Sequence, residues 1–419
     1  MKYSRSSIGL LLVAFVLIGL ACEPSKGRVE EPSVQVGAER LLGNYGAELL
    51  TRNVGLIMNP TARVHGVHVL DTLLAMDIPV KALFAAEHGF RGDQGAGEVI
   101  IDGVDQATGL PVYSLYGATK KPTPEMLEGI DLLIFDMQDV GARFYTYNST
   151  MKYVLEAAAD ADIEAWILDR PNPLGGDYVA GWVLEEEFES FVGMYPIPIA
   201  HGLTLGELAL MAVGEGWLDT ERTPRLEVIP MGGWKRSMKW NQTGLEWVAP
   251  SPNLPTFAHA YAYIGTCFIE GTTLSEGRGT PNPFLTLGGV STDFGEQVEE
   301  MFMHWNNGGV VLNPVKFTPE SIPGKAINPK GMGKLHTGIY LTNPLDIKDP
   351  LSVGLRLMQW LMQHSDQASY KDYLYLLAGT KSIDQLSQQD FELDTEDWSV
   401  DWGLPLEEFK DKRKTYLIY

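Results

Sequence analysis

Cysteine and clustered basic residues are both scarce in this sequence, and each scarcity excludes a class of structure or function. Of the two cysteines, Cys267 lies in the apolar segment YIGTCFIEG, which is typical of a small buried residue and not of a nucleophile. The formal net charge is −22, and no block rich in Lys or Arg interrupts the chain. Because basic residues supply most of the affinity for phosphate backbones, a nucleic-acid partner is not expected.

Recognisable nucleotide and hydrolase motifs are also missing. The dinucleotide fingerprint G-x-G-x-x-G would place a glycine where Ile100 stands. The pair Gly333-Lys334 lacks the upstream glycine of a P-loop, because that position is Asn328. Neither G-x-S-x-G nor H-E-x-x-H occurs. We therefore expect no nucleotide cofactor, no serine nucleophile elbow and no zincin site.

A metal site has little support in the sequence. His65 and His68 have the spacing of two ligands on one helix face, but no third ligand is evident near them. A solvated helix face is the simpler interpretation, so neither a metal nor another cofactor is expected.

The N-terminal segment has the pattern of an export signal. Lys2 and Arg5 precede an uncharged apolar run over residues 8–21, which is too short to span a bilayer core of about 30 Å. The run ends in Gly-Leu-Ala-Cys22, which resembles a bacterial lipoprotein cleavage box. We predict a signal peptide over residues 1–21, lipidation at Cys22, and a polar tether over 22–38 in an exported, periplasmic protein anchored to the membrane, with simple secretion as the alternative. With Cys22 modified, no intramolecular disulfide is available to stabilise the fold.

From about residue 39, short apolar runs alternate with segments of helical period. The runs are rich in Val, Ile and Leu, and this alternation is typical of βαβ units that build a parallel sheet covered on both faces. We expect strands or helices over residues 54–60, 66–76, 79–87, 131–137, 147–161, 163–169 and 204–218. The first half, residues 39–220, is therefore predicted to be a Rossmann-like subdomain of the α/β class.

The second half has a different composition. The strand-like segment RLEVIPM (225–231) is followed by loops dense in Pro, Gly, Ser and Thr. Helix or strand patterns return over residues 296–305, 337–343 and 350–364. A boundary near residue 220 thus predicts a smaller C-terminal α/β, or α+β, subdomain over 221–419.

Three predicted strands of the first half end in acidic residues. Glu87 follows ALFAA and opens a glycine-rich loop, Asp136 and Asp139 lie in FDMQDV, and Asp169 ends ILD. Because the carboxyl ends of parallel strands meet at one edge, we expect these acids to face one ligand crevice. Structural roles stay open for each: Glu87 could cap the next turn, Asp139 could cap the next helix, and Asp169 could pair with Arg170.

Residues suited to binding a sugar lie beside these acids. Arg143 offers a cation for a substrate carboxylate, and Tyr145 and Tyr147 offer aromatic faces for a pyranose ring. Core packing is the alternative for these rings and for Phe144. Tyr116, in SLYG, could donate a phenolic proton or could equally be a core residue.

Later loops add further hydrogen-bonding groups. His201, in IPIAHGLT, is a candidate for substrate binding, whereas Thr204 and Glu207 have the form of a capping box and predict a helix start. The loops 251–256 and 270–284 are long and polar, as binding loops often are. Their candidate binding residues are Asn253, Glu270, Glu276 and Arg278.

Six of these loops, in their order along the chain, resemble one enzyme family. They are EHGFRG (87–92), FDMQDVGARFYTY (135–147), LDRPNPLGG (168–176), HGLTLGELA (201–209), SPNLPT (251–256) and EGTTLSEGRGTPNPF (270–284). Together they closely resemble the exo-β-N-acetylmuramidases of the NamZ type. The resemblance covers the chain from about residue 40 to its end, and it implies a Rossmann-like subdomain joined to a smaller α/β subdomain with the active site in the cleft between them.

The resemblance also implies a reaction. It is the release of N-acetylmuramic acid (MurNAc) from the non-reducing end of peptidoglycan fragments such as MurNAc-GlcNAc, in cell-wall turnover and recycling. The family's proposed catalytic glutamate carries over to Glu87, which would protonate the leaving oxygen, and we hypothesise that Asp136 or Asp139 stabilises the oxocarbenium-like centre. Substrate contacts are expected from His88, Tyr116, Arg143, Tyr145, Tyr147, Asp169, Arg170, Asn172, His201, Asn253, Glu270, Glu276 and Arg278.

One of three arginines would recognise the lactyl carboxylate, which distinguishes MurNAc from glucosamine. The candidates are Arg143, Arg170 and Arg278. Two other interpretations remain open at this stage: a non-catalytic lipoprotein that binds muropeptides, and a different cell-wall hydrolase such as an esterase or amidase.

Overall fold

The computed structural model describes residues 34–91, 102–290, 311–365, 368–388 and 398–419. Residues 33–419 form one compact unit. The predicted signal peptide, Cys22 and the helix expected over 296–305 lie outside the described residues. Within the described ranges, no helix has both the length and the apolar character needed to cross a membrane.

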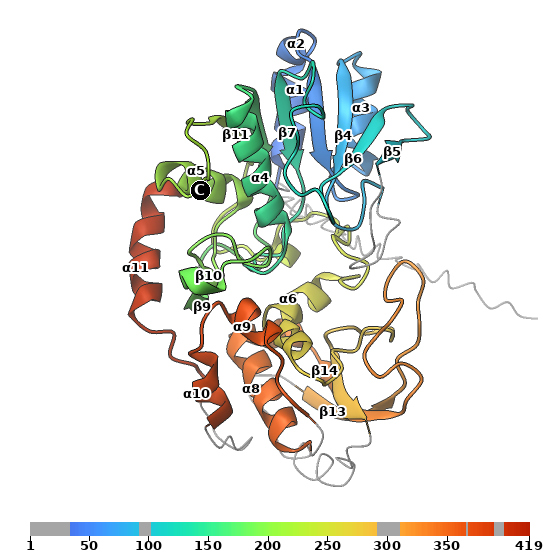
Figure 1. The fold of residues 1–419 in the computed structure, drawn as a ribbon, viewed down its shortest axis with the longest axis vertical. Helices are drawn as coiled ribbons and strands as arrows, with labels where there is room; N and C mark the ends of the chain where they lie inside the picture. The colour runs from blue at the N-terminus through green and yellow to red at the C-terminus, as the bar shows by residue number, and fades with distance from the viewer. Residues whose placement is uncertain (1–33, 92–101, 291–310, 366–367, 389–397) are drawn as a thin grey trace, which may run out of the picture. The chain divides into compact units, whose positions relative to one another are not determined.

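A seven-stranded sheet organises the first half of this unit (Figure 1). Its order is β11-β8-β7-β1-β4-β6-β5, and every neighbouring pair is parallel except β5 with β6. The strands are β1 (Val54–Met58), β4 (Val80–Ala85), β5 (Gly103–Val104), β6 (Pro111–Ser114), β7 (Leu132–Asp136), β8 (Glu164–Leu168) and β11 (Arg225–Ile229). The prediction of an α/β fold is confirmed.

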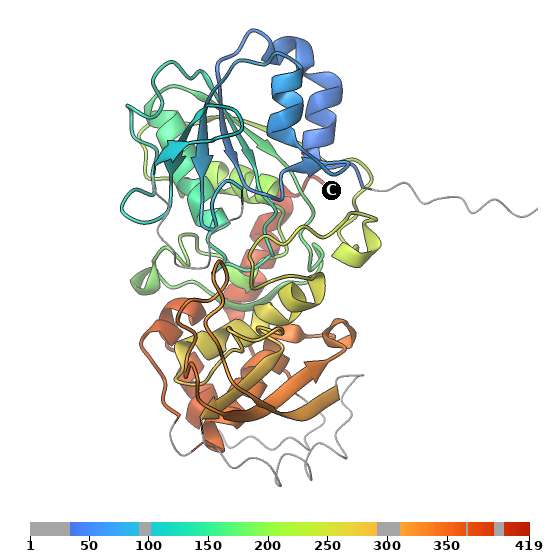
Figure 2. The same ribbon diagram turned by 90° about the vertical axis from the view of Figure 1, so that its right-hand side faces the viewer.

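Helices cover both faces of this sheet. On β1, Leu56 belongs to one buried cluster together with residues of α1 and α3, and Ile57 belongs to another together with residues of α4 and α5. Figure 2 shows the blue helices α1 and α3 on the opposite side of the sheet from the green helix α4. The helices are α1 (Gly37–Asn44), α3 (Val69–Ala75), α4 (Tyr147–Asp160) and α5 (Leu205–Gly214). Because both faces are buried, the central strand β1 is a continuous apolar run, and its neighbour β7 is apolar up to Asp136 at its end.

The strand order reverses once within the sheet. After β1 the chain adds β4 and β6 on one side, and it then returns to add β7, β8 and β11 on the other. The reversal therefore lies between β1 and β7. Such a switch point opens a crevice at the carboxyl ends of the two strands, where open α/β sheets bind ligands.

A three-stranded antiparallel sheet and four helices form the core of the second half. The sheet has the order β12-β14-β13. Helices α6 and α8 cross at Gly265 and Gly354, where a Cβ atom on Gly265 would clash with the Pro350 oxygen. These elements are β12 (Thr286–Val290), β13 (Val311–Phe317), β14 (His336–Thr342), α6 (Phe257–Thr266), α8 (Pro350–Gln363), α9 (Tyr373–Ala378) and α10 (Ile383–Gln388).

The C-terminal residues return to the first sheet. The Tyr419 hydroxyl donates to Asp169 Oδ2 at 2.6 Å, and its ring packs edge-on against Trp234. The remaining elements are short, apart from α11. They are α2 (Gly46–Leu49), β2 (Arg63–Val64), β3 (Val67–His68), η1 (Glu186–Phe188), β9 (Ala180–Val183), β10 (Pro198–Ala200), η2 (Trp240–Gln242), η3 (Cys267–Gly271), η4 (Pro344–Asp346), α11 (Leu404–Lys412) and η5 (Arg413–Tyr416).

The structure differs from the sequence expectations at two elements. The helix expected from residue 66 begins at Val69, because positive φ angles at His65 (49°) and Gly66 (80°) turn the chain into the β2–β3 hairpin. His65 is exposed in this turn and His68 is the buried N-cap of α3, so the two do not share a helix face. The segment 225–231, expected in the second subdomain, supplies edge strand β11 of the first sheet. The boundary near residue 220 stays a prediction.

Two local predictions are confirmed. Thr204 and Glu207 form a complete capping box at the start of α5. Cys267 is a buried free thiol, and burial raises its pKa.

Candidate active site

The carboxyl edge of the seven-stranded sheet carries the acids that the sequence places at strand ends. Glu87 lies two residues beyond β4, Asp136 is the last residue of β7, and Asp169 directly follows β8. Because these strands are parallel, their ends meet at the same edge.

Glu87 is partly buried, and neighbouring hydroxyl groups fix its carboxyl group. Thr146 Oγ1 donates to Glu87 Oε2 at 2.9 Å, and the Tyr116 phenol also hydrogen-bonds to the Glu87 side chain. His88 and Gly89 follow with φ angles of 73° and 79°, so the chain turns sharply immediately after the glutamate. The backbone turn and the hydrogen bonds together hold the carboxyl group in one orientation.

Tyrosines surround Glu87. Burial, the charge of Glu87 and the hydrogen bond to it raise the pKa of Tyr116. Burial is also the main cause of the raised pKa of Tyr147, whose hydroxyl donates to the Pro250 oxygen at 2.6 Å and lies 3.5 Å from the Glu87 backbone oxygen. Burial raises the pKa of Tyr145 as well, and its ring packs edge-to-face on Tyr147. All three phenols therefore keep their protons at neutral pH.

Charged residues of the loop 270–278 lie across the pocket from Glu87. Arg278 Nη2 and Nε donate to Glu270 Oε1 at 2.7 and 3.0 Å, and Lys330 Nζ lies 3.0 Å from Glu276 Oε2. Burial alone would lower the pKa of Arg278, but the charges of Glu270 and Glu276 outweigh it and raise the pKa. Arg278 Nη1 is buried and has no hydrogen-bond partner among the described residues. Arg278 is thus a permanent cation with one donor group still available.

A pocket of about 500 Å³ is lined by Glu87 and by this charged network. The loop 325–330 completes its lining, and two contacts hold that loop: Asn253 Nδ2 donates to the Lys325 oxygen at 2.8 Å, and Lys330 Nζ donates to the Ile269 oxygen at 2.8 Å. The Lys325 side chain is exposed, and no ion pair engages it within the described ranges. The lining residues are Glu87, Glu270, Glu276, Arg278 and residues 325–330.

Asp136 and Arg170 form a buried ion pair at the ends of β7 and β8. Arg170 Nε and Nη2 donate to the two carboxylate oxygens of Asp136 at 2.5 and 3.0 Å. Asp136 is fully buried, so its charge is balanced by Arg170 and not by solvent. Neither residue lines the pocket of Glu87.

Asp139 and His201 are buried together. His201 Nε2 lies 3.8 Å from Asp139 Oδ2, and the Gly141 amide donates to the same oxygen at 2.7 Å. Asp139 Oδ1 and His201 Nε2 have no hydrogen-bond partner in the part of the chain that the structure describes. Asp139 therefore shapes its own loop and does not cap α4, whose N-cap is Thr146.

Arg143 and Asn172 hold backbone segments together. The Arg143 guanidinium donates to four carbonyl oxygens, and burial lowers its pKa to about 9. Asn172 Nδ2 donates to the Leu203 oxygen, and its Oδ1 accepts from the Leu174 amide. Both side chains are buried and engaged by these backbone groups, although Arg143 Nε has no hydrogen-bond partner among the described residues, so the geometry favours structural roles for them.

Two family models together match this chain from residue 54 to residue 419. The N-terminal model of the exo-β-N-acetylmuramidase NamZ matches residues 54–258, and the C-terminal model matches residues 261–419. The chain belongs to the NamZ family. A curated relative, the peptidoglycan β-N-acetylmuramidase NamZ of Bacillus subtilis (strain 168), is 38% identical over 427 aligned residues, which cover 98% of each chain.

Two crystal structures of DUF1343 family proteins from Bacteroides fragilis NCTC 9343 resemble the NamZ-family fold seen here. One has a TM-score of 0.75 and 35% identity, with 93% of this chain and 99% of that chain covered. The other has a TM-score of 0.76 and 32% identity, with 92% and 99% covered. Both therefore share the α/β architecture over nearly their whole length.

The motifs that led to the NamZ family divide into two groups in the structure. One group lies at or beside the pocket: Glu87, His88, Tyr116, Tyr145, Tyr147, Asn253, Glu270, Glu276 and Arg278. The other group is paired within the protein: Asp136, Asp139, Arg143, Asp169, Arg170, Asn172 and His201. The catalytic and binding roles assigned from the sequence remain predictions for both groups. The residues of the first group are the ones that lie where a ligand in the pocket could contact them.

Sequence reasoning missed the loop 325–330 and Thr146. Lys325, Lys330 and Lys334 lie within ten residues of one another in a chain of net charge −22, and this local excess of lysine is the signal that could have identified the loop. Thr146 lies inside the motif FDMQDVGARFYTY, but nothing in the sequence indicates that its hydroxyl points toward Glu87.

Asp169 is the buried carboxylate whose hydrogen bonds can be tested by changing the pH. Its carboxylate accepts hydrogen bonds from Thr204 Oγ1, the Gly206 amide and the Tyr419 hydroxyl at 2.7, 2.9 and 2.6 Å. Burial nevertheless raises its pKa to about 6, because the hydrogen bonds only partly offset the loss of solvent.

We predict that this raised pKa makes Asp169 contribute less to stability as the pH rises. An unfolded Asp has a pKa near 3.9. The contribution of Asp169 to the free energy of unfolding is therefore fully present below about pH 4, and it is lost as the pH rises through about 6. The stability advantage of the wild type over Asp169→Asn should fall by roughly 3 kcal/mol between pH 4 and pH 7, at about 1.4 kcal/mol per pKa unit. Urea unfolding at both pH values measures this, with the exposed Asp219→Asn as control. An advantage that stays constant with pH contradicts the prediction.

Proposed function

We propose that this protein is an exo-acting glycoside hydrolase that releases MurNAc from the non-reducing end of peptidoglycan fragments, with MurNAc-GlcNAc as the simplest substrate. The observation that carries the proposal is the pocket of about 500 Å³ lined by Glu87, in a chain that matches both NamZ family models. The 38% identical Bacillus subtilis relative bears the name of a peptidoglycan β-N-acetylmuramidase. Such an enzyme would act in cell-wall turnover and recycling.

Glu87 is the proposed proton donor to the leaving glycosidic oxygen. Glycosidic cleavage requires a carboxyl group held beside the scissile bond. Thr146 and Tyr116 fix the Glu87 carboxyl group at the pocket, which is the preorganisation that such a role needs.

The second catalytic group is sought among the carboxylates of the pocket lining. Neither Asp136 nor Asp139 lines the pocket of Glu87. Glu270 and Glu276 do line it. We therefore propose that positive charge at the sugar ring is stabilised by Glu270 or Glu276, or by the acetamido group of the substrate itself.

Arg278 is the proposed receptor for the lactyl carboxylate. Of the three arginines expected for this role, it alone lines the pocket of Glu87. Its unengaged Nη1 can donate to a carboxylate oxygen, and Lys325 adds a second positive charge at the exposed side of the pocket. Glu270 and Glu276 hold the guanidinium in place for this contact.

We also propose that the protein is exported, lipidated at Cys22 and retained at a membrane facing the periplasm. The support is the N-terminal sequence alone: the positive start, the apolar run over residues 8–21 and the cleavage box that ends in Cys22. Large peptidoglycan fragments are met outside the cytoplasm, so this location suits the proposed substrate.

Glu87→Gln should lower kcat for MurNAc-GlcNAc by about 10²- to 10⁴-fold, the usual contribution of a general acid. The amide keeps the shape of the side chain but cannot transfer the proton. Mass spectrometry of the two released monosaccharides measures turnover, and the exposed Glu128→Gln serves as the matched control. Near-normal release by Glu87→Gln would refute the role of Glu87, and absence of release by the wild type would refute the function.

Arg278→Lys should raise KM for a chromogenic β-MurNAc glycoside by about 10- to 100-fold, because charged hydrogen bonds contribute about 1.5–3 kcal/mol. The variant keeps the positive charge that balances Glu270 and Glu276, so the pocket should stay folded. The KM for the matching glycoside of N-acetylglucosamine, which lacks the lactyl group, should change much less. Equal effects on both substrates would show that Arg278 does not recognise the carboxylate.

Lipidation predicts a mature N-terminus at Cys22 that carries acyl chains. Intact-mass measurement of the protein from bacterial membranes should find this mass, and Cys22→Ser should shift the protein to the soluble fraction. A soluble wild-type protein with an unmodified Cys22 would favour simple secretion instead.

A further inference from the structure

A second pocket lies on the same sheet edge and shares no lining residue with the pocket of Glu87. Its volume is about 260 Å³. It is lined by the chain that leaves β1 (Thr61 and 63–66), by Gln138 after β7 and by Arg170 after β8. The rest of the lining comes from Val34, Val36 and Glu39 at the start of α1 and from the segment 240–248. Nothing in the proposed reaction uses it.

This second pocket occupies the topological switch point of the sheet. The strand order reverses between β1 and β7, and the loops that leave these two strands supply Thr61 and Gln138 to the lining. In open α/β sheets the crevice at this position is the usual ligand site. Glu87 instead follows β4, which lies beyond β1 on the other side of the switch.

Two polar side chains are fixed in the floor of the second pocket. Asp136 holds Arg170 through Nε and Nη2, which leaves Nη1 as the donor not engaged by that carboxylate. Gln138 Nε2 donates to the Asp139 and Pro171 oxygens, both at 2.8 Å, so the amide orientation is set. Gln138 is 2% exposed, and its Oε1 is buried without a hydrogen-bond partner among the described residues.

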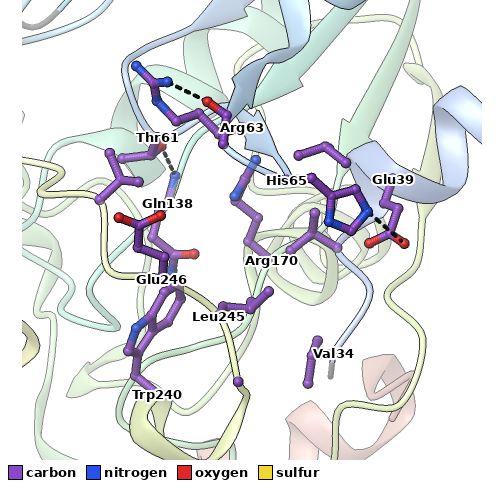
Figure 3. A pocket seen from close by; sticks show the side chains of 15 residues that line it. Val34, Glu39, Thr61, Arg63, His65, Gln138, Arg170, Trp240, Leu245 and Glu246 are labelled. Atoms are coloured by element: carbon purple, nitrogen blue, oxygen red, sulfur yellow. Dashed lines mark hydrogen bonds and ion pairs between the residues drawn. The ribbon is translucent and has the colours of Figure 1, made fainter. Parts of the chain in front are cut away.

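An acceptor, Gln138 Oε1, and a donor, Arg170 Nη1, therefore belong to residues that line the same pocket. In Figure 3, Arg170 lies between Gln138 and the His65–Glu39 pair, and Trp240 lies below Gln138. An unsatisfied buried oxygen costs about 1–3 kcal/mol, which a ligand N–H group would recover. A trans secondary amide carries its N–H and its C=O on opposite edges, so it matches this pair when it lies between the Gln138 acceptor and the Arg170 donor.

The remaining walls are apolar, and the charges at the rim largely cancel. Trp240 is buried against Trp247 in an edge-to-face contact, and Leu245 and Val248 add aliphatic surface. His65 Nε2 lies 3.6 Å from Glu39 Oε1, and Arg63 donates to two backbone oxygens. With Glu246 also at the rim, the pocket offers no cluster of unpaired cations for a strongly anionic ligand.

We propose that the switch-point pocket is a second, non-catalytic saccharide site that binds the acetamido group of an N-acetylated amino sugar. The acetamido N–H donates to Gln138 Oε1, its oxygen accepts from Arg170, and its methyl group packs against Leu245 and Trp240. The volume suits one sugar ring, since it lies below the range of about 300–1,000 Å³ typical of drug-sized ligands. The choice of a sugar over another secondary amide rests on the proposed function.

The segment that lines this site continues to residues that contact Tyr147 and the loop 325–330. Val248 lines the second pocket, Pro250 accepts the hydrogen bond of Tyr147, and Asn253 holds Lys325. A saccharide at the switch point thus contacts the same stretch of chain that positions the loop 325–330. The site can retain a fragment or a product next to the place of cleavage without taking part in the chemistry.

The test uses calorimetric titration of the full mature protein with N-acetylglucosamine. Leu245→Trp fills the second pocket with an indole ring and should weaken this binding at least tenfold, or remove one site if the titration shows two. The exposed Leu50→Trp makes the same change on the surface and should bind as the wild type does. Glucosamine, which lacks the acetyl group, should bind at least tenfold more weakly than N-acetylglucosamine.

Three results would overturn the proposal. One is the absence of N-acetylglucosamine binding at millimolar concentrations, another is an affinity that Leu245→Trp leaves unchanged, and the third is tighter binding of the dipeptide Ala-Ala than of the sugar. Val248→Phe fills the same pocket and serves if Leu245→Trp does not fold. Hydrolysis of MurNAc-GlcNAc is measured on the same samples. If the proposed function is wrong, the wild type shows no turnover. If the second site is wrong, Leu245→Trp binds N-acetylglucosamine with unchanged affinity.

Discussion

The parallel registration of β8, β7, β1 and β4 is the constraint on which both pockets depend. Hydrogen bonds tie each strand to its neighbour, so the residues just beyond their carboxyl ends keep fixed separations. Glu87 follows one of these strands, and the Asp136–Arg170 pair joins the ends of two others. The second half of the chain then has only to add a wall, which it does with the loops 270–278 and 325–330.

Many polar residues of the motifs do not face the pocket, because a buried charge needs partners within the protein to replace its lost hydration. Three of these buried polar side chains have such partners. Asp136 has Arg170, Arg143 has four carbonyl oxygens, and Asp169 has hydroxyl and amide donors that include the last residue of the chain. These contacts hold the loops at the strand ends together, while Glu87 and Arg278 are held by Thr146, Glu270 and Glu276 and line the pocket.

The sequence predicts the parallel sheet and the position of Glu87 well, because both follow from local patterns. A buried strand is a continuous apolar run, and an acid at its end lies at the ligand edge whatever the rest of the fold does. The roles of Arg143, Arg170 and Asp136 could not be predicted in this way. Whether a charged side chain meets a substrate or a partner depends on contacts between residues far apart in sequence, such as Arg143 with Leu377 and Ala378. The same limit explains why strand β11 was expected in the second subdomain. Its local sequence predicts a strand but does not indicate that the strand pairs with β8.

The most direct test of the account is a crystal structure of Glu87→Gln soaked with intact MurNAc-GlcNAc. The account predicts the disaccharide in the pocket of about 500 Å³, with the glycosidic oxygen within hydrogen-bond distance of the residue 87 side chain and the lactyl carboxylate on Arg278. A MurNAc ring bound with its glycosidic oxygen away from residue 87, or with its carboxylate turned from Arg278, would contradict it.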